Sequence, residues 1–209
     1  MWKTGRLGRD DVEVRDSEVV YQGFFSMEKF RLRHRLFSGG WSREFTRELF
    51  VRSKAVGVLL YDPEHELIGL IEQFRVGAMA TPGGPWLLEV VAGVAEVNEI
   101  SQEVARRELS EEAGVKNARL VPICEYLVSP GGTNEIQELW CGLSDLRDGG
   151  GTFGLANENE DIKLHIIPEA EVMDWLAAGR CNNAATIICL QWLQMNRDRL
   201  HNGPVSGTV

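Results

Sequence analysis

The chain lacks the features that mark several classes of protein. It has only four cysteines, which lie far apart and form no C-x-x-C pair: Cys124, Cys141, Cys181 and Cys189. This spacing disfavours a disulfide framework or a zinc knuckle and favours reduced, buried thiols. No stretch approaches about eighteen apolar residues, and the opening segment MWKTGRLGRDDVEV contains no apolar h-region. We therefore expect a soluble, cytoplasmic protein without a membrane partner.

Positive charge is scarce as well. Lysine and arginine number 22 against 31 acidic residues, which leaves a formal net charge of −9. A nucleic-acid partner needs a basic surface that neutralises phosphates, so this balance argues against one. It still permits a small anionic substrate where local cations or metal ions receive the negative charge. The four histidines show no metal-ligand spacing, and we assign none of them a role: His34, His65, His165 and His201.

One glycine-rich segment fails as a nucleotide site. GGGTFG at 149–154 satisfies G-x-G-x-x-G, but LANENED follows it where a helix N-terminus would be needed for a pyrophosphate. We interpret this segment as a flexible hinge.

What is present suits a globular fold of one large domain, or of one domain with a small appendage. Three runs within residues 18–50 alternate polar and apolar residues, which predicts a small antiparallel sheet. We therefore expect an N-terminal sheet region over 1–52, a main domain over 53–200, and a disordered tail over 201–209.

The main domain mixes strands and helices. We expect a helix over 101–113 that Ser101 caps at its start and Gly114 ends at the C′ position. A hairpin is predicted around Asp62-Pro63. The remaining predicted strands are 86–93, 119–128, 136–143 and 162–167, and the remaining helices are 168–178 and 183–197.

The segment RRELSEEAGV at 106–115 stacks three acids on the predicted helix: Glu108, Glu111 and Glu112. Like charges three or four residues apart destabilise a helix by roughly 0.2–0.5 kcal/mol each. A solvated acidic surface is the commoner explanation of such a run. A site for Mg²⁺ is the alternative, because this cation takes carboxylate oxygens together with substrate phosphates.

The wider segment GVAEVNEISQEVARRELSEEAGV at 93–115 resembles the Nudix box, G-x5-E-x7-R-E-U-x-E-E-x-G-U. It matches at every fixed position: Gly93, Glu99, Arg107, Glu108, Leu109, Glu111, Glu112, Gly114 and Val115. The resemblance implies an α/β fold, specifically an α/β/α sandwich with a mixed sheet. It also implies hydrolysis of a nucleoside diphosphate linked to another moiety. The implied cofactor is Mg²⁺, with Mn²⁺ as a substitute, and two or three ions bind.

The Nudix resemblance also implies residue roles. Glu108 and Glu112 are expected as direct metal ligands, Glu111 as a direct or water-mediated one, and the Ala92 carbonyl as a further ligand. Arg107 and Glu99 are expected to form an orienting ion pair beside them. In the acidic segment NENED at 157–161, Glu158 is expected as the general base and Glu160 as a further metal ligand. The choice of base among Glu158, Glu160 and Asp161 stays open.

SPGGT at 129–133 is similar to the marker of the ADP-ribose pyrophosphatases, a group of dimeric bacterial enzymes, and the resemblance covers roughly residues 10–197. It implies that metal-activated water hydrolyses ADP-ribose to AMP and ribose 5-phosphate. The alternatives are another nucleoside diphosphate sugar, such as GDP-mannose or ADP-glucose, and a non-catalytic nucleotide-sensing regulator. The intact box and the absence of a basic helix-turn-helix disfavour the regulator.

The same resemblance implies a homodimer in which the 1–52 region exchanges between subunits and completes the partner's substrate site. The substrate contacts that it implies are Phe24, Arg47, Arg75, Val94, Ser129 and Glu135. For Phe24 a role in the core is an open alternative, because GFF presents two rings on opposite faces of a strand.

Overall fold

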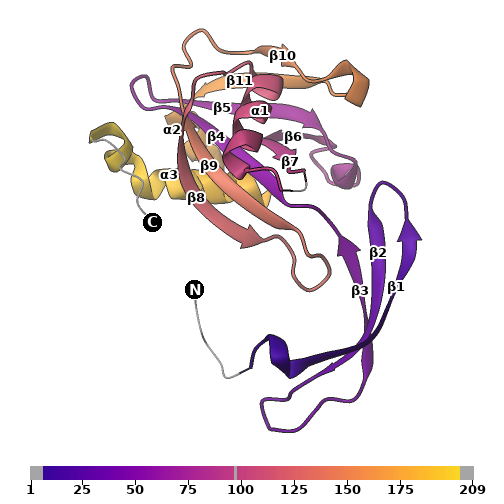
Figure 1. Ribbon diagram of the computed structural model, residues 1–209. Helices are drawn as coiled ribbons and strands as arrows, with labels where there is room; N and C mark the ends of the chain where they lie inside the picture. The colour runs from indigo at the N-terminus through magenta and orange to yellow at the C-terminus, as the bar shows by residue number, and fades with distance from the viewer. Residues whose placement is uncertain (1–6, 97, 203–209) are drawn as a thin grey trace. The chain divides into compact units, whose positions relative to one another are not determined.

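The computed structural model describes residues 7–96 and 98–202, except the side chains of Glu158 and Asn202. The chain divides into two compact units. The smaller unit contains the residues up to Ser53 together with Leu127–Ile136. The larger unit contains Lys54–Tyr126 and the residues from Gln137 onward (Figure 1).

The smaller unit is a three-stranded antiparallel sheet in the order β1-β2-β3. The chain enters it through the 3-10 helix Arg9–Asp11, and its strands are β1 (Val12–Gln22), β2 (Ser26–His34) and β3 (Phe45–Val51). This confirms the predicted N-terminal sheet. Almost every residue of β1 is exposed, including the apolar side chains Val14, Val19 and Tyr21. The sheet therefore buries little apolar surface of its own.

The larger unit contains an eight-stranded sheet in the order β10-β11-β5-β4-β9-β8, with β6 beside β5 and β7 beside β4. The central strand β4 pairs antiparallel with β5 and parallel with β9, so the sheet is mixed, as predicted. The strands are β4 (Ala55–Asp62), β5 (Leu67–Phe74), β6 (Trp86–Glu89), β7 (Val91–Val94), β8 (Arg119–Leu127), β9 (Ile136–Leu143), β10 (Gly151–Phe153) and β11 (Ile162–Pro168).

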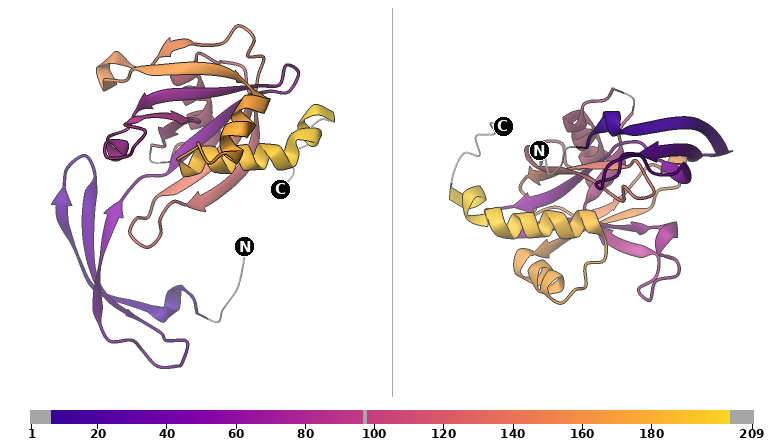
Figure 2. Two further views of the ribbon diagram at one scale, coloured as in Figure 1. Left: turned by 180° about the vertical axis from the view of Figure 1, so that it is seen from behind. Right: turned by 90° about the horizontal axis from the view of Figure 1, so that it is seen from below.

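Helices cover both faces of this sheet (Figures 1 and 2). Alternate residues of β4 point to opposite sides: Leu59 packs in one core cluster and Leu60 in the other. The first cluster includes side chains of α2 (Glu169–Ala177) and α3 (Ala184–Asn202), and the second includes those of α1 (Ser101–Ala113). This arrangement confirms the α/β/α sandwich. It also places α1 alone on the face that carries the Nudix-box residues.

Three predicted segments differ in the structure. The single strand predicted over 86–93 is two strands, β6 and β7, which pair with β5 and β4 respectively. Gly151–Phe153, predicted as part of a hinge, is strand β10 and pairs with β11. Helix α3 continues to Asn202, beyond its predicted end at 197. Leu200 is buried in the core, and His201 Nε2 lies 2.8 Å from the Tyr61 hydroxyl, so tertiary contacts extend the helix.

The Tyr61 hydroxyl also belongs to a buried polar network. The Tyr61 hydroxyl donates to Glu169 Oε2 at 2.7 Å, and Arg197 Nε lies 2.9 Å from Glu169 Oε1. The network therefore joins β4, the start of α2 and the end of α3. Residues 203–209 of the expected tail lie outside the described residues. Within the described ranges, no helix combines the length and the apolar character needed to cross a bilayer.

Candidate active site

Helix α1 carries the acidic residues, and its two ends form differently. Gly114 ends it in the left-handed conformation, with φ of 66°, as predicted. The prediction that Ser101 caps its start is wrong, because Ile100 holds the cap position and makes no side-chain cap hydrogen bond. The Ser101 hydroxyl instead donates to Glu138 Oε2 on β9 at 2.6 Å. The hydroxyl is therefore directed at a distant strand and not at the backbone N–H groups of the first helical turn.

The acids of α1 differ in burial. Val104, Ala105 and Leu109 pack in the core, and this turns the adjacent Glu108 and Glu112 toward the sheet. Glu108 is 8% exposed and Glu112 is 3% exposed. These two side chains therefore do not belong to a solvated acidic surface.

Glu108 crosses the backbone of β7 at Gly93. A Cβ added at Gly93 would lie 2.6 Å from Glu108 Cγ and closer still to Glu108 Cδ and Oε1. No residue with a side chain fits there unless Glu108 moves. The glycine of the box thus allows a carboxylate to reach the strand end.

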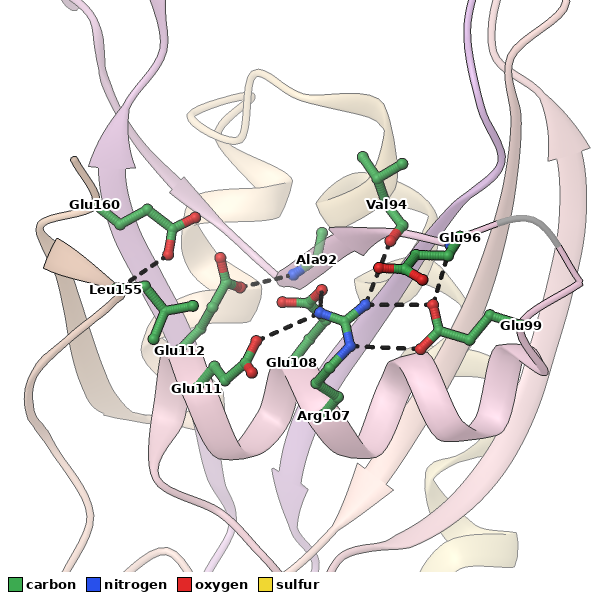
Figure 3. A network of polar contacts seen from close by, with 10 residues as sticks. All are labelled: Ala92, Val94, Glu96, Glu99, Arg107, Glu108, Glu111, Glu112, Leu155 and Glu160. Carbon is green, nitrogen blue, oxygen red and sulfur yellow. Dashed lines mark hydrogen bonds and ion pairs between the residues drawn. The ribbon is translucent and has the colours of Figure 1, made fainter. Parts of the chain in front are cut away.

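Arg107 is the centre of the polar network in Figure 3. Its Nη1 contacts Glu108 Oε1 at 2.6 Å and Glu111 Oε2 at 3.3 Å, and its Nε lies 3.4 Å from Glu99 Oε1. Its Nη2 donates to the Val94 carbonyl at 3.4 Å. One guanidinium therefore links the helix to the loop that precedes it.

Glu99 is itself held in place. The Glu96 backbone N–H donates to Glu99 Oε2 at 3.0 Å. This hydrogen bond and the neighbouring Arg107 lower the pKa of the Glu99 carboxyl. Glu99 is therefore a fixed anion that orients Arg107.

Glu112 is buried, and the charge of Arg75 only partly opposes the rise of its pKa. Its Oε2 accepts a hydrogen bond from the Ala92 backbone N–H at 2.9 Å. Burial raises the pKa of Glu112 to about 8; the Ala92 bond opposes the rise, and the charges of Glu108 and Glu160 add to it. Burial likewise raises the pKa of Glu108, although Arg107 opposes this.

The loop after β10 brings a further acid to the box. It contains the 3-10 helix Ala156–Glu158, and the Leu155 backbone N–H donates to Glu160 Oε2 at 3.2 Å. Glu160 raises the pKa of both Glu108 and Glu112 by its charge. NENED and the box are thus close in space, although they are far apart in the sequence. The side chain of Glu158 lies outside the described part of the chain.

This donor set fits a hard divalent cation. Three carboxylates, Glu108, Glu112 and Glu160, repel one another at a site that is partly shielded from water. Such a cation prefers oxygen ligands and would remove this repulsion. Arg107 contacts Glu108, and the charge of Arg75 lowers the pKa of Glu112, but the pKa of Glu112 still stays at about 8.

A second acidic group lies elsewhere. Ligand atoms of Asp62, His65 and Asp145 lie within 4.8 Å of one another. Asp62, however, accepts hydrogen bonds from the backbone N–H groups of Glu64, His65 and Leu146, and its Oδ2 lies 2.9 Å from His65 Nδ1. Its oxygens are already occupied, so this carboxylate stabilises the turn between β4 and β5.

Arg75 and Val94 are the substrate residues expected from the larger unit. Arg75 Nε donates to Glu89 Oε2 at 2.7 Å, and the Val94 carbonyl faces Arg107. A cavity of about 380 Å³ opens beside Arg75. Its lining residues are Gln73, Phe74, Arg75, Trp86, Asn159, Glu160 and Asp161. The sequence interpretation missed Gln73 and Glu89. The sequence could have indicated Gln73, because residues two apart in an extended segment point to the same side and Gln73 lies two residues before Arg75.

The smaller unit holds the other expected substrate residues. Phe24 is 95% exposed, while Phe25 packs edge-to-face on Phe50 with ring centroids 5.1 Å apart. Phe24 therefore does not pack in a core of the described chain, whereas Phe25 is half-buried against Phe50. The Arg47 guanidinium lies 4.5 Å from the centroid of the Phe45 ring.

Ser129 and Glu135 lie at the two ends of the loop in this unit. The Ser129 carbonyl accepts hydrogen bonds from the backbone N–H groups of Gly132 and Thr133, each at 3.0 Å. Arg52 Nη2 lies 3.3 Å from Glu135 Oε1. The SPGGT segment thus forms a closed turn with an anchored carboxylate after it.

Comparison with known proteins gives the family. A model described as "NUDIX domain" matches residues 51–180. The chain is 45% identical over 196 residues to "ADP-ribose pyrophosphatase" of Escherichia coli (strain K12), with 94% of each chain covered. It is 30% identical over 182 residues to "GDP-mannose pyrophosphatase" of Yersinia enterocolitica, which covers 86% of this chain and 93% of that one.

A solved structure agrees on the fold. "Crystal structure of ADP compounds hydrolase" superimposes with a TM-score of 0.67 at 19% identity and covers 91% of this chain and 97% of that one. The matched segment contains the whole box, including Gly93, Arg107 and the three box glutamates Glu108, Glu111 and Glu112. The chain therefore belongs to the Nudix family.

Proposed function

We propose that this protein hydrolyses ADP-ribose to AMP and ribose 5-phosphate. One observation carries the proposal: the buried carboxylates Glu108 and Glu112 converge with Glu160 beside β7, in a chain 45% identical to a named ADP-ribose pyrophosphatase. Acids whose pKa is raised by burial and by neighbouring charges are candidates for a functional site.

The proposed cofactor is Mg²⁺, which Mn²⁺ can replace, with two or three ions bound. Glu108, Glu112, Glu160 and the Ala92 carbonyl would hold them, and Glu111 directly or through water. When bound, such cations offset charge on phosphoryl oxygens and lower the pKa of water.

The chain's own residues supply orientation and proton transfer. Arg107, held by Glu99, keeps Glu108 turned toward β7. We assign Glu158 as the base that takes the proton of the attacking water, with Glu160 and Asp161 as alternatives. Arg75 and Val94 would contact the substrate from the larger unit.

The contacts from the 1–52 region are proposed to come from a second subunit. Phe24 would stack on adenine, and Arg47 would contact adenine or phosphate. Ser129 would contact the substrate, and Glu135 would bind near the terminal ribose or the metal ions. The exposed ring of Phe24 and the exposed apolar residues of β1 support a homodimer that exchanges the 1–52 region.

Subunit mixing tests this sharing. Arg47→Ala and Glu112→Gln each inactivate their own preparation. In a mixed dimer, one site combines an intact Glu112 with the partner's intact Arg47 and regains activity. If the two variants are shown to exchange subunits and activity does not return, the shared site is contradicted.

The activity itself is tested by turnover of ADP-ribose with Mg²⁺ in ¹⁸O-water, with product masses read out. Label in either product is expected, and its position identifies the phosphorus attacked. GDP-mannose and ADP-glucose form the comparison panel, since relatives of this chain include a named GDP-mannose pyrophosphatase. A kcat/KM for GDP-mannose comparable to that for ADP-ribose would overturn the substrate assignment.

Glu112→Gln tests the site. It keeps the shape of a side chain that accepts a hydrogen bond from Ala92 and removes its charge. We expect Mg²⁺-dependent turnover to fall by at least about 100-fold. Unchanged turnover would mean that α1 is only a structural acidic helix.

A further inference from the structure

One buried polar atom beside the active site has no partner in the protein. Among the described residues, the buried side-chain nitrogens without a hydrogen bond are Gln73 Nε2, Trp140 Nε1 and Arg197 Nε. Arg197 Nε lies 2.9 Å from Glu169, and the Trp140 indole neighbours the Glu138 carboxylate. Of these three nitrogens, Gln73 Nε2 is the one for which the structure records no interacting carboxylate.

Gln73 lies on β5 opposite Leu87 of β6 and is only 7% exposed. It shares a strand face with Ile71, which packs in the core under α1. It also lines the 380 Å³ cavity that contains Arg75. The amide is therefore shielded from bulk water but borders an open space large enough for part of a ligand.

Leaving a buried amide donor unpaired is unfavourable, so such a group calls for an explanation. The cavity has donors on one side and acids on the other. Gln73 on β5 and Arg75 directly after it are donors, whereas Glu160 and Asp161 are acids from the loop after β10. A phosphoryl group has acceptor oxygens and negative charge. It therefore suits the side that carries Gln73 and Arg75, while the acidic side would receive it only through the metal ions proposed there.

We propose that Gln73 is a substrate-binding residue whose Nε2 donates a hydrogen bond to a phosphoryl oxygen of the bound nucleoside diphosphate. The inference deepens the proposed function and rests on it. Because the acceptor belongs to the diphosphate, the contact is the same for every base and sugar. Gln73 thus contributes to affinity for the shared part of these substrates and not to the choice among them.

Gln73→Met tests this, because methionine keeps the length of the side chain and removes the amide. In the free protein the variant should melt higher by about 2–4 °C, since a buried unpaired donor is gone. Its kcat/KM for ADP-ribose should fall by about 10- to 100-fold, the loss of one hydrogen bond to a charged group. Stability and activity are thus expected to move in opposite directions.

Gln137→Met is the matched control. Gln137 is an amide on β9 whose Oε1 accepts from the Tyr126 hydroxyl at 2.6 Å. Its loss should lower the melting temperature. A fall in the melting temperature of Gln73→Met like that of the control would overturn the proposal, as would a kcat/KM within twofold of wild type.

ADP and GDP as competitive inhibitors, with Mg²⁺, test the acceptor. Their inhibition constants should rise by the same factor in Gln73→Met, because they share the diphosphate and differ in the base. A rise confined to ADP would mean that Gln73 reads the base and would refute the phosphoryl assignment. If the wild type binds ADP but does not hydrolyse ADP-ribose, the proposed function fails. An equal loss of affinity for ADP and GDP in Gln73→Met would still support this contact.

Discussion

Gly93→Ala should disable the site through a single steric contact. The new Cβ would lie 2.6 Å from Glu108 Cγ, and carbon atoms prefer separations of about 3.5–4.0 Å. Glu108 must therefore move by about 1 Å or more or adopt another rotamer. A displacement of that size at a reacting centre can lower the rate by about 100-fold. Overpacking of this kind should also cost about 1–3 kcal/mol of the free energy of unfolding.

The assay is kcat/KM for ADP-ribose across a Mg²⁺ titration, together with urea unfolding. Gly77→Ala is the control, because nothing lies within 4 Å of a Cβ added there. The control should keep its activity and its stability. If Gly93→Ala retains kcat/KM within threefold of wild type, the inference that Glu108 needs this space is refuted.

A double-mutant cycle assigns the effect to Glu108. The three nearest neighbours of the added Cβ all belong to that side chain, and Glu108→Ala removes them. In the Glu108→Ala background, Gly93→Ala should therefore cost less than about 0.5 kcal/mol of unfolding free energy. Equal costs in both backgrounds would show that another contact is responsible.

Three further predictions follow from other contacts. Divalent metal should raise the thermal midpoint of the wild type. In EDTA the wild type should melt at a lower temperature than Glu108→Gln, because that variant removes a repelling charge, and calorimetry measures both effects. Tyr61→Phe should cost about 1–3 kcal/mol in urea unfolding without changing kcat/KM, since it removes one of two partners of buried Glu169 and leaves only Arg197. Burial raises the pKa of Asp62, but hydrogen bonds from Leu146 and His65 outweigh it and lower the pKa below 3.8. Asp62 thus stabilises the fold above pH 3.8 and loses this effect as pH falls further, so the cost of Asp62→Asn should shrink between pH 7 and pH 3.

Local patterns predicted the elements well where neighbouring residues decide the conformation. The end of α1 at Gly114 is such a case, because only the backbone at that residue must adopt a positive φ. The strands around the Asp62-Pro63 turn are another. These features depend on residues a few positions apart, which a sequence displays directly.

Predictions failed where a distant group competed. Ser101 had the right residue type for a cap, yet its hydroxyl is directed at Glu138 on β9 and Ile100 holds the cap position. Helix α3 continues because Leu200 and His201 find partners in the core and on β4. The short strand β10 forms because β11 offers it a pairing edge. None of these partners is close in sequence to the residue that it controls.

By itself, the sequence determined the family, the mixed α/β class and the acids of α1, because the spacing of the box is local and specific. Only the tertiary structure decided which acids are buried, that Glu160 joins Glu108 and Glu112, and that Gln73 is left unpaired beside Arg75. Burial and electrostatic repulsion depend on what surrounds a group in space. Strands and loops far apart in the chain supply those surroundings, so they appear only once the chain has folded.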